Sequence, residues 1–329
     1  MTPPASRPLV AVTFGPVTDL LRHALADVAE LASASSRVPD PERAAVLGAA
    51  DALLVWNASR ELRPGEGPGL PARFVQLVSA GADHLPFGEL PPGATVASNV
   101  GAYAEPMAEH ALAMALALLK RLPQNHAKLA GGVWDQSLTR SLQGATCGVV
   151  GFGGIGKATG RRMRALGARV LAINTTGRTT EPVDFAGTLA DLDAVLAESD
   201  VVVLSVPLTR ATTGLVSTPQ LRTMKPDAVL VNVARGAVVD EAALYAHLRD
   251  HPEFSAGLDT WWVEPFHQGE FRVGHPFFSL PNVLGSPHNS ALVPGMVEEA
   301  VRRAAANVAR FLRGEPVTGV VRPEDYAGT

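Results

Sequence analysis

The chain has 329 residues, about the length of two domains that each bury a core, and its 47% hydrophobic and 18% charged residues exclude a disordered chain. A net charge of −4 without a cluster of Lys and Arg argues against nucleic acid as a partner, and the single cysteine, Cys147, excludes a disulfide framework and a cysteine-built metal site. The first ten residues lack a secretory-signal pattern and the longest apolar run, 111–119, is too short to span a bilayer, so we expect a cytoplasmic protein that binds no metal and no membrane.

The first third of the chain alternates β-rich runs with helical patterns, which is typical of parallel α/β sheets. A segment dense in Gly and Pro, 60–71, is predicted to be a loop, and a long helix is predicted over 106–122. The predicted strands are 9–14, 52–55, 74–78 and 95–97, and the predicted helices are 17–29 and 41–50.

The middle of the chain repeats this alternation more regularly and predicts a doubly wound sheet of six strands. Helices are expected between several of them, and Asp240 is a plausible N-cap for the last. The predicted strands are 146–150, 169–173, 200–204, 228–232, 254–258 and 282–285, and the helices are 155–166, 189–198 and 240–249.

A final helix, 295–313, leads to a polar tail that we expect to return to the first domain. The chain would then form a split domain, 1–98 plus 293–329, with a second domain, 99–292, inserted in it. The predicted fold class is therefore α/β with two doubly wound domains.

A glycine-rich loop follows the first strand of the six-stranded sheet and precedes an amphipathic helix. Gly151 permits the tight turn, Gly153 lets a pyrophosphate approach the backbone, and Gly156 lets the helix pack closely on the strand. The phosphates then meet free N–H groups at the helix N-terminus. This context predicts a dinucleotide or adenosine cofactor. Similar loops occur in methyltransferases and flavoproteins, and a Gly-rich turn that binds no nucleotide is the alternative.

Three polar residues come just after predicted strands of the same sheet: Arg235, Glu264 and His288. The carboxyl ends of parallel strands share one edge, where ligands bind, so we expect these side chains to converge beside the cofactor. A guanidinium can hold a carboxylate and polarise a carbonyl, a histidine can exchange the hydroxyl proton, and a carboxylate can orient the imidazole. Together they fit hydride transfer on a 2-hydroxy or 2-oxo acid. Singly, they also fit a surface ion pair, a solvated loop and a histidine in a turn.

In this order, the motifs resemble the D-isomer-specific 2-hydroxyacid dehydrogenase family, which includes glyoxylate/hydroxypyruvate reductases, phosphoglycerate dehydrogenases and formate dehydrogenases. VSAGADHL (78–85) resembles the family's substrate loop, VVGFGGIGK (149–157) its cofactor loop, and VPLTRATTGLV (206–216) the stretch beside the nicotinamide. The arginine, glutamate and histidine lie in further matching segments, 224–244, 257–265 and 280–290. The first 70 residues match only in pattern.

The resemblance implies an NAD(P)-dependent reductase of small 2-oxoacids with a flavodoxin-like substrate domain, an inserted Rossmann-type NAD(P)-binding domain and a homodimer formed through the cofactor domain. Glyoxylate and hydroxypyruvate are the leading substrates, and larger or branched oxoacids are alternatives. Arg235, Glu264 and His288 fall on the catalytic positions, and the N–H groups around Ala80, Gly81 and Ala82 would bind the substrate carboxylate.

The implied cofactor site includes Asp259, which would hold the nicotinamide carboxamide, and Thr212, which would contact a phosphate. The full set of cofactor-binding residues is Gly151, Phe152, Gly153, Gly154, Ile155, Gly156, Asn174, Thr175, Arg178, Val206, Pro207, Thr212, Val233, Ala234 and Asp259.

Residue 174 departs from the family pattern and bears on the choice of cofactor. NAD-binding members have an Asp or Glu there, which binds the ribose hydroxyls and repels a 2′-phosphate. Here Asn174 removes the charge, while Thr175 and Arg178 add donors that suit a phosphate. We therefore expect NADP(H) to be favoured over NAD(H). A solvated polar loop that still serves NAD is the alternative.

Further departures are Ser205 and His84, where many members have His and Asn, and the bulky Trp261 and Trp262, which we interpret as packing residues. The alternative functions are a dinucleotide-sensing corepressor-like protein of the same fold and another family dehydrogenase of phosphoglycerate or formate type. Formate oxidation releases no hydroxyl proton, so Glu264 argues against that type. A methyltransferase would explain none of the three polar residues.

Overall fold

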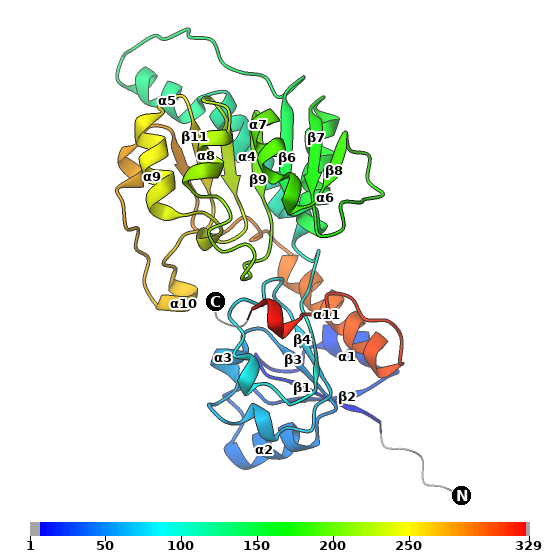
Figure 1. The fold of residues 1–329 in the computed structure, drawn as a ribbon. Coiled ribbons are helices and arrows are strands. Elements are labelled where there is room, and N and C mark those ends of the chain that lie inside the picture. The colour runs from blue at the N-terminus through cyan, green and yellow to red at the C-terminus, as the bar shows by residue number, and fades with distance from the viewer. Residues whose placement is uncertain (1–6, 327–329) are drawn as a thin grey trace, which may run out of the picture. The chain divides into compact units, whose positions relative to one another are not determined.

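The computed structural model describes residues 7–326, which form two compact α/β units (Figure 1). One unit combines the described residues up to Ala102 with those from Pro294 onward, and we call it the split unit. The other comprises Tyr103–Val293, and we call it the inserted unit. Among the described residues, no helix has the length and apolar character needed to cross a membrane.

The split unit is built on a five-stranded parallel sheet with the strand order β2-β1-β3-β4-β5. Four strands match predictions, but β2 is missing from them because this edge strand has no fully buried residue and lacks the apolar run of its neighbours. The predicted helix 17–29 is also too long and ends at Leu25. The strands are β1 Leu9–Val12, β2 Glu30–Ser33, β3 Ala52–Val55, β4 Phe74–Leu77 and β5 Thr95–Ala97, and the helices are α1 Asp19–Leu25, α2 Asp40–Ala49, α3 Ala58–Glu61 and α11 Met296–Leu312.

Helices cover both faces of this sheet. On one face α2 and α3 pack against the inner strands, and on the other α11 lies on β4, where Phe311 stacks on Phe74 with ring centroids 4.4 Å apart. The C-terminal segment joins the same unit: Val320 forms an antiparallel bridge with Ala97. The end of the chain therefore completes the core of the unit in which the chain begins.

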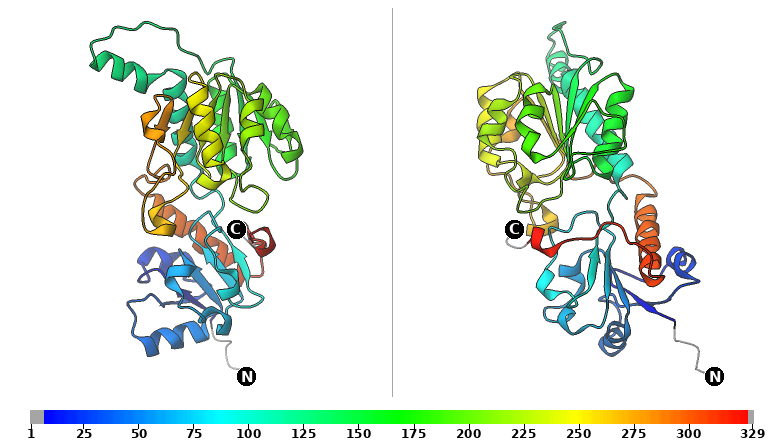
Figure 2. Two further views of the ribbon diagram at one scale, coloured as in Figure 1. Left: turned by 60° about the vertical axis from the view of Figure 1, so that its left-hand side comes forward. Right: turned by 45° about the vertical axis from the view of Figure 1, so that its right-hand side comes forward.

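The inserted unit holds a seven-stranded parallel sheet with the order β12-β11-β10-β9-β6-β7-β8 and helices on both faces (Figure 2). All six predicted strands are present. The prediction missed β8, a three-residue edge strand, and it extended the helix over 106–122 too far, because Arg121 has a left-handed backbone (φ 50°) and separates two helices. The strands are β6 Thr146–Val150, β7 Arg169–Ile173, β8 Phe185–Gly187, β9 Val201–Leu204, β10 Val229–Asn232, β11 Ser255–Leu258 and β12 Val283–Gly285. The helices are α4 Ala104–Leu119, α5 Leu122–Ala130, α6 Gly154–Ala165, α7 Leu192–Glu198, α8 Thr218–Thr223, α9 Glu241–Asp250 and α10 Pro265–Gln268.

Successive residues of the inner strands face opposite cores of this unit. Val201 and Val203 of β9 pack with α4 and α6, whereas Val202 and Leu204 pack with α7, α8 and α9. From β6 the sheet continues through β7 to β8 on one side and through β9 to β12 on the other. The carboxyl ends of β6 and β9 therefore flank the switch point, where doubly wound proteins bind ligands.

Candidate active site

The glycine loop joins β6 to α6 at this switch point. A Cβ atom on Gly151, whose φ is 97°, would lie 2.6 Å from the main chain of Ser205, and one on Gly156 would lie 2.2 Å from the carbonyl oxygen of Gly151. These two glycines are therefore required by packing. A Cβ on Gly153 would meet nothing within 4 Å, so this side of the loop is open. Because α6 begins at Gly154, its first N–H groups lack helical partners beside that opening, which suits a pyrophosphate.

Two neighbouring features of the switch point fix the loop. Phe152 is buried and its ring packs where a Cβ on Gly160 of α6 would lie, while Ile155 faces the core beside α4. The hydroxyl of Ser205, the residue that follows β9, donates to the carbonyl oxygen of Gly151 at 2.8 Å. This serine, at a position where many members of the family that the sequence resembles have His, therefore ties β9 to the loop.

The loop after β7 is closed by Asn174. Its amide nitrogen donates to the carbonyl oxygen of Arg178 at 2.8 Å, and its amide oxygen accepts from the N–H of Thr176 at 2.9 Å. Thr175 and Arg178 are exposed, and the Arg178 guanidinium has no intramolecular partner among the described residues. The sequence assigned Asn174 to the cofactor, but its side chain organises the loop that presents the arginine.

The segments after β9 and β10 carry the other predicted cofactor residues. Thr212 is buried, and its hydroxyl donates to the carbonyl oxygen of Pro207 at 2.6 Å and accepts from the N–H of Thr209 at 2.8 Å. This hydroxyl therefore closes its own turn. The side chains of Val206, Val233 and Ala234 are buried at the ends of the two strands.

Asp259 follows β11 and is fully buried, with its carboxylate directed at the segment after β12. Oδ1 accepts from the Ser286 hydroxyl at 2.6 Å and from the Asn289 N–H at 3.1 Å, and Oδ2 accepts from the Ser290 N–H at 3.2 Å. His110 of α4 reaches the same Ser286 hydroxyl through Nε2 at 2.9 Å. Asp259 thus clamps the segment that carries His288, a role the sequence did not reveal, and its contact with a carboxamide stays a prediction.

Glu264 and His288 form a direct pair at the same edge of the sheet. Nδ1 of His288 lies 2.8 Å from Oε2 of Glu264, and since a carboxylate only accepts, Nδ1 carries the hydrogen. Glu264 is 4% exposed, and its Oε1 accepts from the N–H of Trp261 at 2.7 Å. Nε2 of His288 has no partner among the residues that the structure describes, so it is the ring nitrogen left for a ligand.

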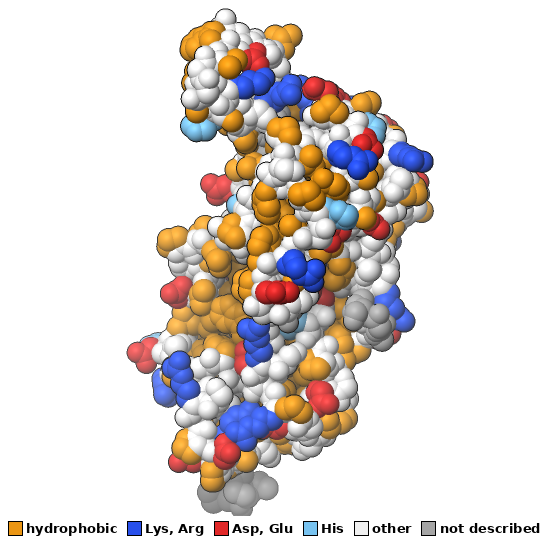
Figure 3. Space-filling model, turned by 90° about the vertical axis from the view of Figure 1, so that its left-hand side faces the viewer, with side chains coloured by type: hydrophobic (Ala, Val, Ile, Leu, Met, Phe, Trp, Pro, Cys, Tyr) orange, Lys and Arg blue, Asp and Glu red, His pale blue; other side chains and the backbone are white. Residues whose placement is uncertain are grey.

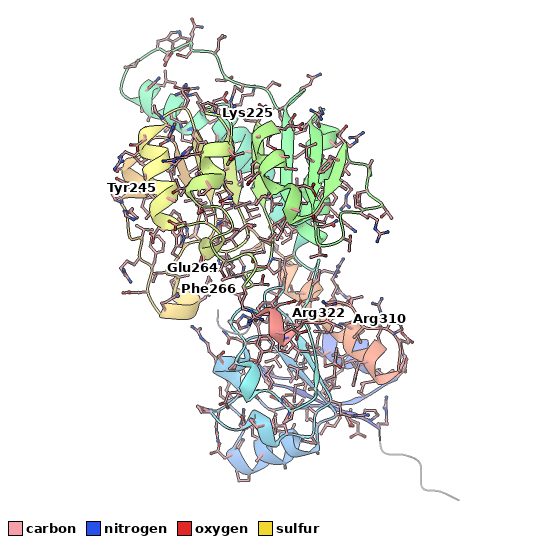
Figure 4. All side chains as sticks on the ribbon, viewed as in Figure 1. Lys225, Tyr245, Glu264, Phe266, Arg310 and Arg322 are labelled. Carbon is pink, nitrogen blue, oxygen red and sulfur yellow. The ribbon has the colours of Figure 1, made fainter. Side chains whose placement is uncertain are left out.

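The backbone and the surroundings of His288 fix the plane of its ring. Its φ is 51°, a left-handed conformation that costs energy in a non-glycine residue, and its N–H donates to the carbonyl oxygen of Asp259 at 2.8 Å. The ring of Phe266 meets the imidazole edge to face, with centroids 5.5 Å apart. Figure 4 labels Glu264 and Phe266 around the start of α10.

Arg235 follows β10, the strand next to β11. One guanidinium nitrogen donates to the carbonyl oxygen of Ala234 at 2.8 Å, and the Asn232 amide donates to the carbonyl oxygen of Arg235 at 2.9 Å. A Cβ on Gly236 would lie 2.3 Å from the main chain of Trp261, so the arginine's loop packs directly on the loop that leads to Glu264. The inserted unit therefore carries all three predicted catalytic residues on adjacent strand ends.

The predicted carboxylate-binding loop belongs to the split unit and follows β4. Ala80 and Gly81 are partly exposed and Ala82 is buried. The Ser79 hydroxyl donates to the carbonyl oxygen of Gly81 at 3.1 Å, which shapes the turn. The N–H groups of this turn are the part that the sequence assigns to a substrate carboxylate.

The comparisons with known proteins agree with one another. Residues 112–290 match the family model described as D-isomer specific 2-hydroxyacid dehydrogenase, NAD binding domain. A glyoxylate reductase from Pyrococcus furiosus is 32% identical over 262 residues, which cover 77% of this chain and 76% of that protein. A hydroxypyruvate reductase from Thermotoga maritima is 30% identical over 266 residues, which cover 80% of this chain and 85% of that protein.

A solved structure matches along nearly the whole chain. The D-isomer specific 2-hydroxyacid dehydrogenase from Xanthobacter autotrophicus, in complex with NADPH and MES, has a TM-score of 0.80 and 28% identity and covers 97% of this chain and 99% of that one. This chain therefore belongs to the D-isomer-specific 2-hydroxyacid dehydrogenase family.

Proposed function

We propose that this protein reduces a small 2-oxoacid to the D-2-hydroxyacid with NAD(P)H and is of the glyoxylate/hydroxypyruvate reductase type. The observation that carries the proposal is the Glu264–His288 pair, which is buried on the glutamate side and leaves Nε2 of the histidine to a ligand. The similarity to glyoxylate and hydroxypyruvate reductases supports it.

The residues of the inserted unit suit a dinucleotide. Gly153 leaves the pyrophosphate side of the loop open, while Gly151 and Gly156 fill their places tightly. The loop and the first N–H groups of α6 would hold the phosphates, and the cofactor, when bound, would supply a hydride to the substrate carbonyl carbon.

Each of the three polar side chains at the strand ends has a role in this proposed reaction. Nε2 of His288 donates a proton to the carbonyl oxygen as that oxygen becomes a hydroxyl. Glu264 orients the imidazole through Nδ1 and balances its positive charge. The Arg235 guanidinium holds the substrate carboxylate and polarises the carbonyl. We also propose that the N–H groups of Ala80, Gly81 and Ala82 in the split unit bind a substrate carboxylate.

We also propose that NADP(H) is favoured over NAD(H). Asn174 carries no charge that would repel a 2′-phosphate, and its side chain is used within the loop. The exposed Arg178 guanidinium provides a positive charge without an intramolecular partner in the described part of the chain. The NADPH complex of the Xanthobacter autotrophicus relative supports this choice.

A homodimer is the assembly we propose, formed through the inserted unit. Helix α5 and the segment after it, 131–142, project from the rest of the unit (Figure 2). This arm carries apolar side chains that are exposed, among them Trp134 at 77% and Leu138 at 95%, and Figure 3 shows hydrophobic groups at its surface. Exposed apolar side chains of this kind support a protein interface at the arm. Sedimentation of the protein and of W134D/L138D, which we expect to be monomeric, checks the assembly.

A substrate panel tests the proposed activity. Purified protein is assayed with NADPH and with NADH against glyoxylate, hydroxypyruvate, and branched and aromatic 2-oxoacids, with H288A as the control for contaminating reductases. We expect reduction of at least one small 2-oxoacid that H288A abolishes. Tight binding of the dinucleotide without turnover of any oxoacid would contradict the proposal and favour a dinucleotide-sensing protein.

A further inference from the structure

Two consecutive tryptophans follow β11, and each donates its indole N–H to a main-chain carbonyl. Nε1 of Trp262 donates to the carbonyl oxygen of Val239 at 2.7 Å, away from the polar residues. Nε1 of Trp261 donates to the carbonyl oxygen of Ser286 at 2.9 Å, two residues before His288. The two side chains therefore make the same kind of bond, but only one of them holds the histidine's segment.

Trp261 is hydrogen-bonded to Glu264 and to the segment that carries His288. Its main-chain N–H donates to Oε1 of Glu264 at 2.7 Å, and its indole N–H holds the segment of His288. The other carboxylate oxygen of Glu264, Oε2, accepts from Nδ1 of His288 at 2.8 Å. Three hydrogen bonds and a short piece of main chain thus form a closed loop. It runs from Trp261 through Glu264 to His288, along the main chain to Ser286, and back to the Trp261 indole.

The Trp261 side chain is buried and closely packed. It is 6% exposed, and a Cβ on Gly285 would lie 2.8 Å from its ring, so the indole packs on the main chain of β12 just before Ser286. Phe278 lies over it, with ring centroids 5.1 Å apart. The indole therefore fixes the place where the chain leaves β12 and turns into the left-handed conformation of His288.

We propose that Trp261 is a positioning residue for the proton transfer: its indole N–H sets the angle at which His288 meets Glu264 and presents Nε2. The inference rests on the proposed function, because it concerns how that reaction's proton donor is aligned. A displacement of about 1 Å at a reacting group can lower turnover on the order of 10²-fold, so one hydrogen bond at this point has a large effect. Packing alone, which is the interpretation from the sequence, predicts no such effect.

The test compares W261F with W262F, since each removes one indole N–H and keeps an aromatic ring. For W261F we expect kcat to fall on the order of 10-fold or more, with the Kd of NADPH unchanged. For W262F we expect kcat and Kd close to those of the parent. Equal losses of kcat in the two variants would overturn the proposal. So would a loss of kcat in W261F that is fully explained by a lower Tm of that variant.

A double-mutant cycle with E264Q separates positioning from general damage. If Trp261 acts through the pair, W261F costs much less in the E264Q background than in the parent protein. Additive losses would mean that Trp261 supports the fold and not the pair.

The ring resonances of His288, assigned with H288A, provide a readout that needs no substrate. W261F should shift them and W262F should not. If the parent protein reduces no oxoacid, the proposed function fails while this measurement still decides the positioning role, and unchanged resonances in W261F would refute it.

Discussion

In both α/β units a glutamate lies just beyond the carboxyl ends of the parallel strands. In the split unit, Glu61 accepts from the Thr13 hydroxyl at 2.6 Å and the Trp56 N–H at 3.0 Å through one oxygen, and from the Asn57 N–H at 2.7 Å through the other. In the inserted unit, Glu264 accepts from one N–H, and its second oxygen binds the imidazole of His288. The first carboxylate joins loops of its own sheet, whereas the second orients a group with a free nitrogen.

The same contrast separates two arginines. Arg43 of α2 is buried and donates to the carbonyl oxygens of Ala34 and Glu61, at 3.0 and 2.8 Å, and to the Glu66 carboxylate. Arg178, in the loop after β7, is exposed, and its guanidinium is without an intramolecular partner among the described residues. A polar group whose bonding capacity is filled by the protein supports the fold, and one that keeps an open donor or acceptor is available to a ligand.

The largest expected effect concerns His288, the member of the Glu264–His288 pair that has a ring nitrogen available to a ligand. H288A removes the proton donor, so we expect turnover to fall on the order of 10²–10⁴-fold, the usual scale of general acid–base catalysis. The glycine loop is separate from this side chain, so the Kd of NADPH should stay close to that of the parent. Steady-state kinetics with glyoxylate and fluorescence titration of NADPH measure the two quantities. Near-normal turnover in H288A would contradict the assignment of His288 as the proton donor.

The two glutamates provide the next test. E264Q keeps an acceptor for the Trp261 N–H but loses the charge that orients the imidazole, so kcat should fall on the order of 10–10²-fold with little change in Tm. E61Q should leave kcat unchanged and lower Tm, because an amide nitrogen cannot accept from the Trp56 N–H. Thermal melts and kcat measured on both variants decide the matter. A larger loss of kcat in E61Q than in E264Q would reverse the assignment.

Arg178 tests whether an unpaired cation in the loop after a strand binds a ligand. R178A should weaken NADPH binding by about 1.5–3 kcal/mol, the scale of a hydrogen bond to a charged group, and change NADH binding little. Its Tm should match that of the parent, because the guanidinium has no partner within the described chain. Titrations with both dinucleotides check this, and NADH serves as the internal control. A catalytic efficiency with NADH equal to that with NADPH in the parent would contradict the preference.

The sequence predicts the inner part of both sheets well, and the reason is burial on two faces. A run such as Val201–Leu204 is apolar at every position because each residue meets one core or the other. The sequence does not predict the edge strands β2 and β8, because half of their environment is solvent and they lack an apolar run. Local capping chemistry is also readable: Asp240 accepts from the Ala243 N–H at 2.8 Å, as predicted for an N-cap.

The sequence predicts the site only in part. It shows the order of the site residues along the chain, but it does not show the contacts between residues that are distant in sequence. The position after each strand placed Glu264 and His288 at one edge of the sheet, and the structure joins them. The clamp from Asp259 to Ser286 and Ser290, and the left-handed backbone that it supports, join segments whose spacing has no local pattern. The sequence indicates only packing for Trp261 for the same reason, since the partner of its indole N–H, the carbonyl oxygen of Ser286, follows another strand.

The smallest expected effect distinguishes the two units by pH. Burial raises the pKa of the Glu61 carboxyl, although its hydrogen bonds from Thr13, Asn57 and Trp56 oppose the shift. The folded protein therefore holds this proton more tightly than the unfolded chain does. The resulting stabilisation is complete below the ordinary pKa of 4.5 and is lost as pH rises through the higher pKa of the folded state.

Urea unfolding at several pH values from 4 to 7 isolates this contribution when the parent protein is compared with E61Q, which cannot titrate at this position. The free energy of unfolding of the parent, minus that of E61Q, should decrease as pH rises, because only the parent loses a bound proton there. A difference that stays constant or grows with pH would mean that the hydrogen bonds to Glu61 outweigh its burial. In that case the ionised Glu61 would stabilise the fold at neutral pH. The two glutamates would then differ only in whether the second carboxylate oxygen accepts a hydrogen bond from a histidine.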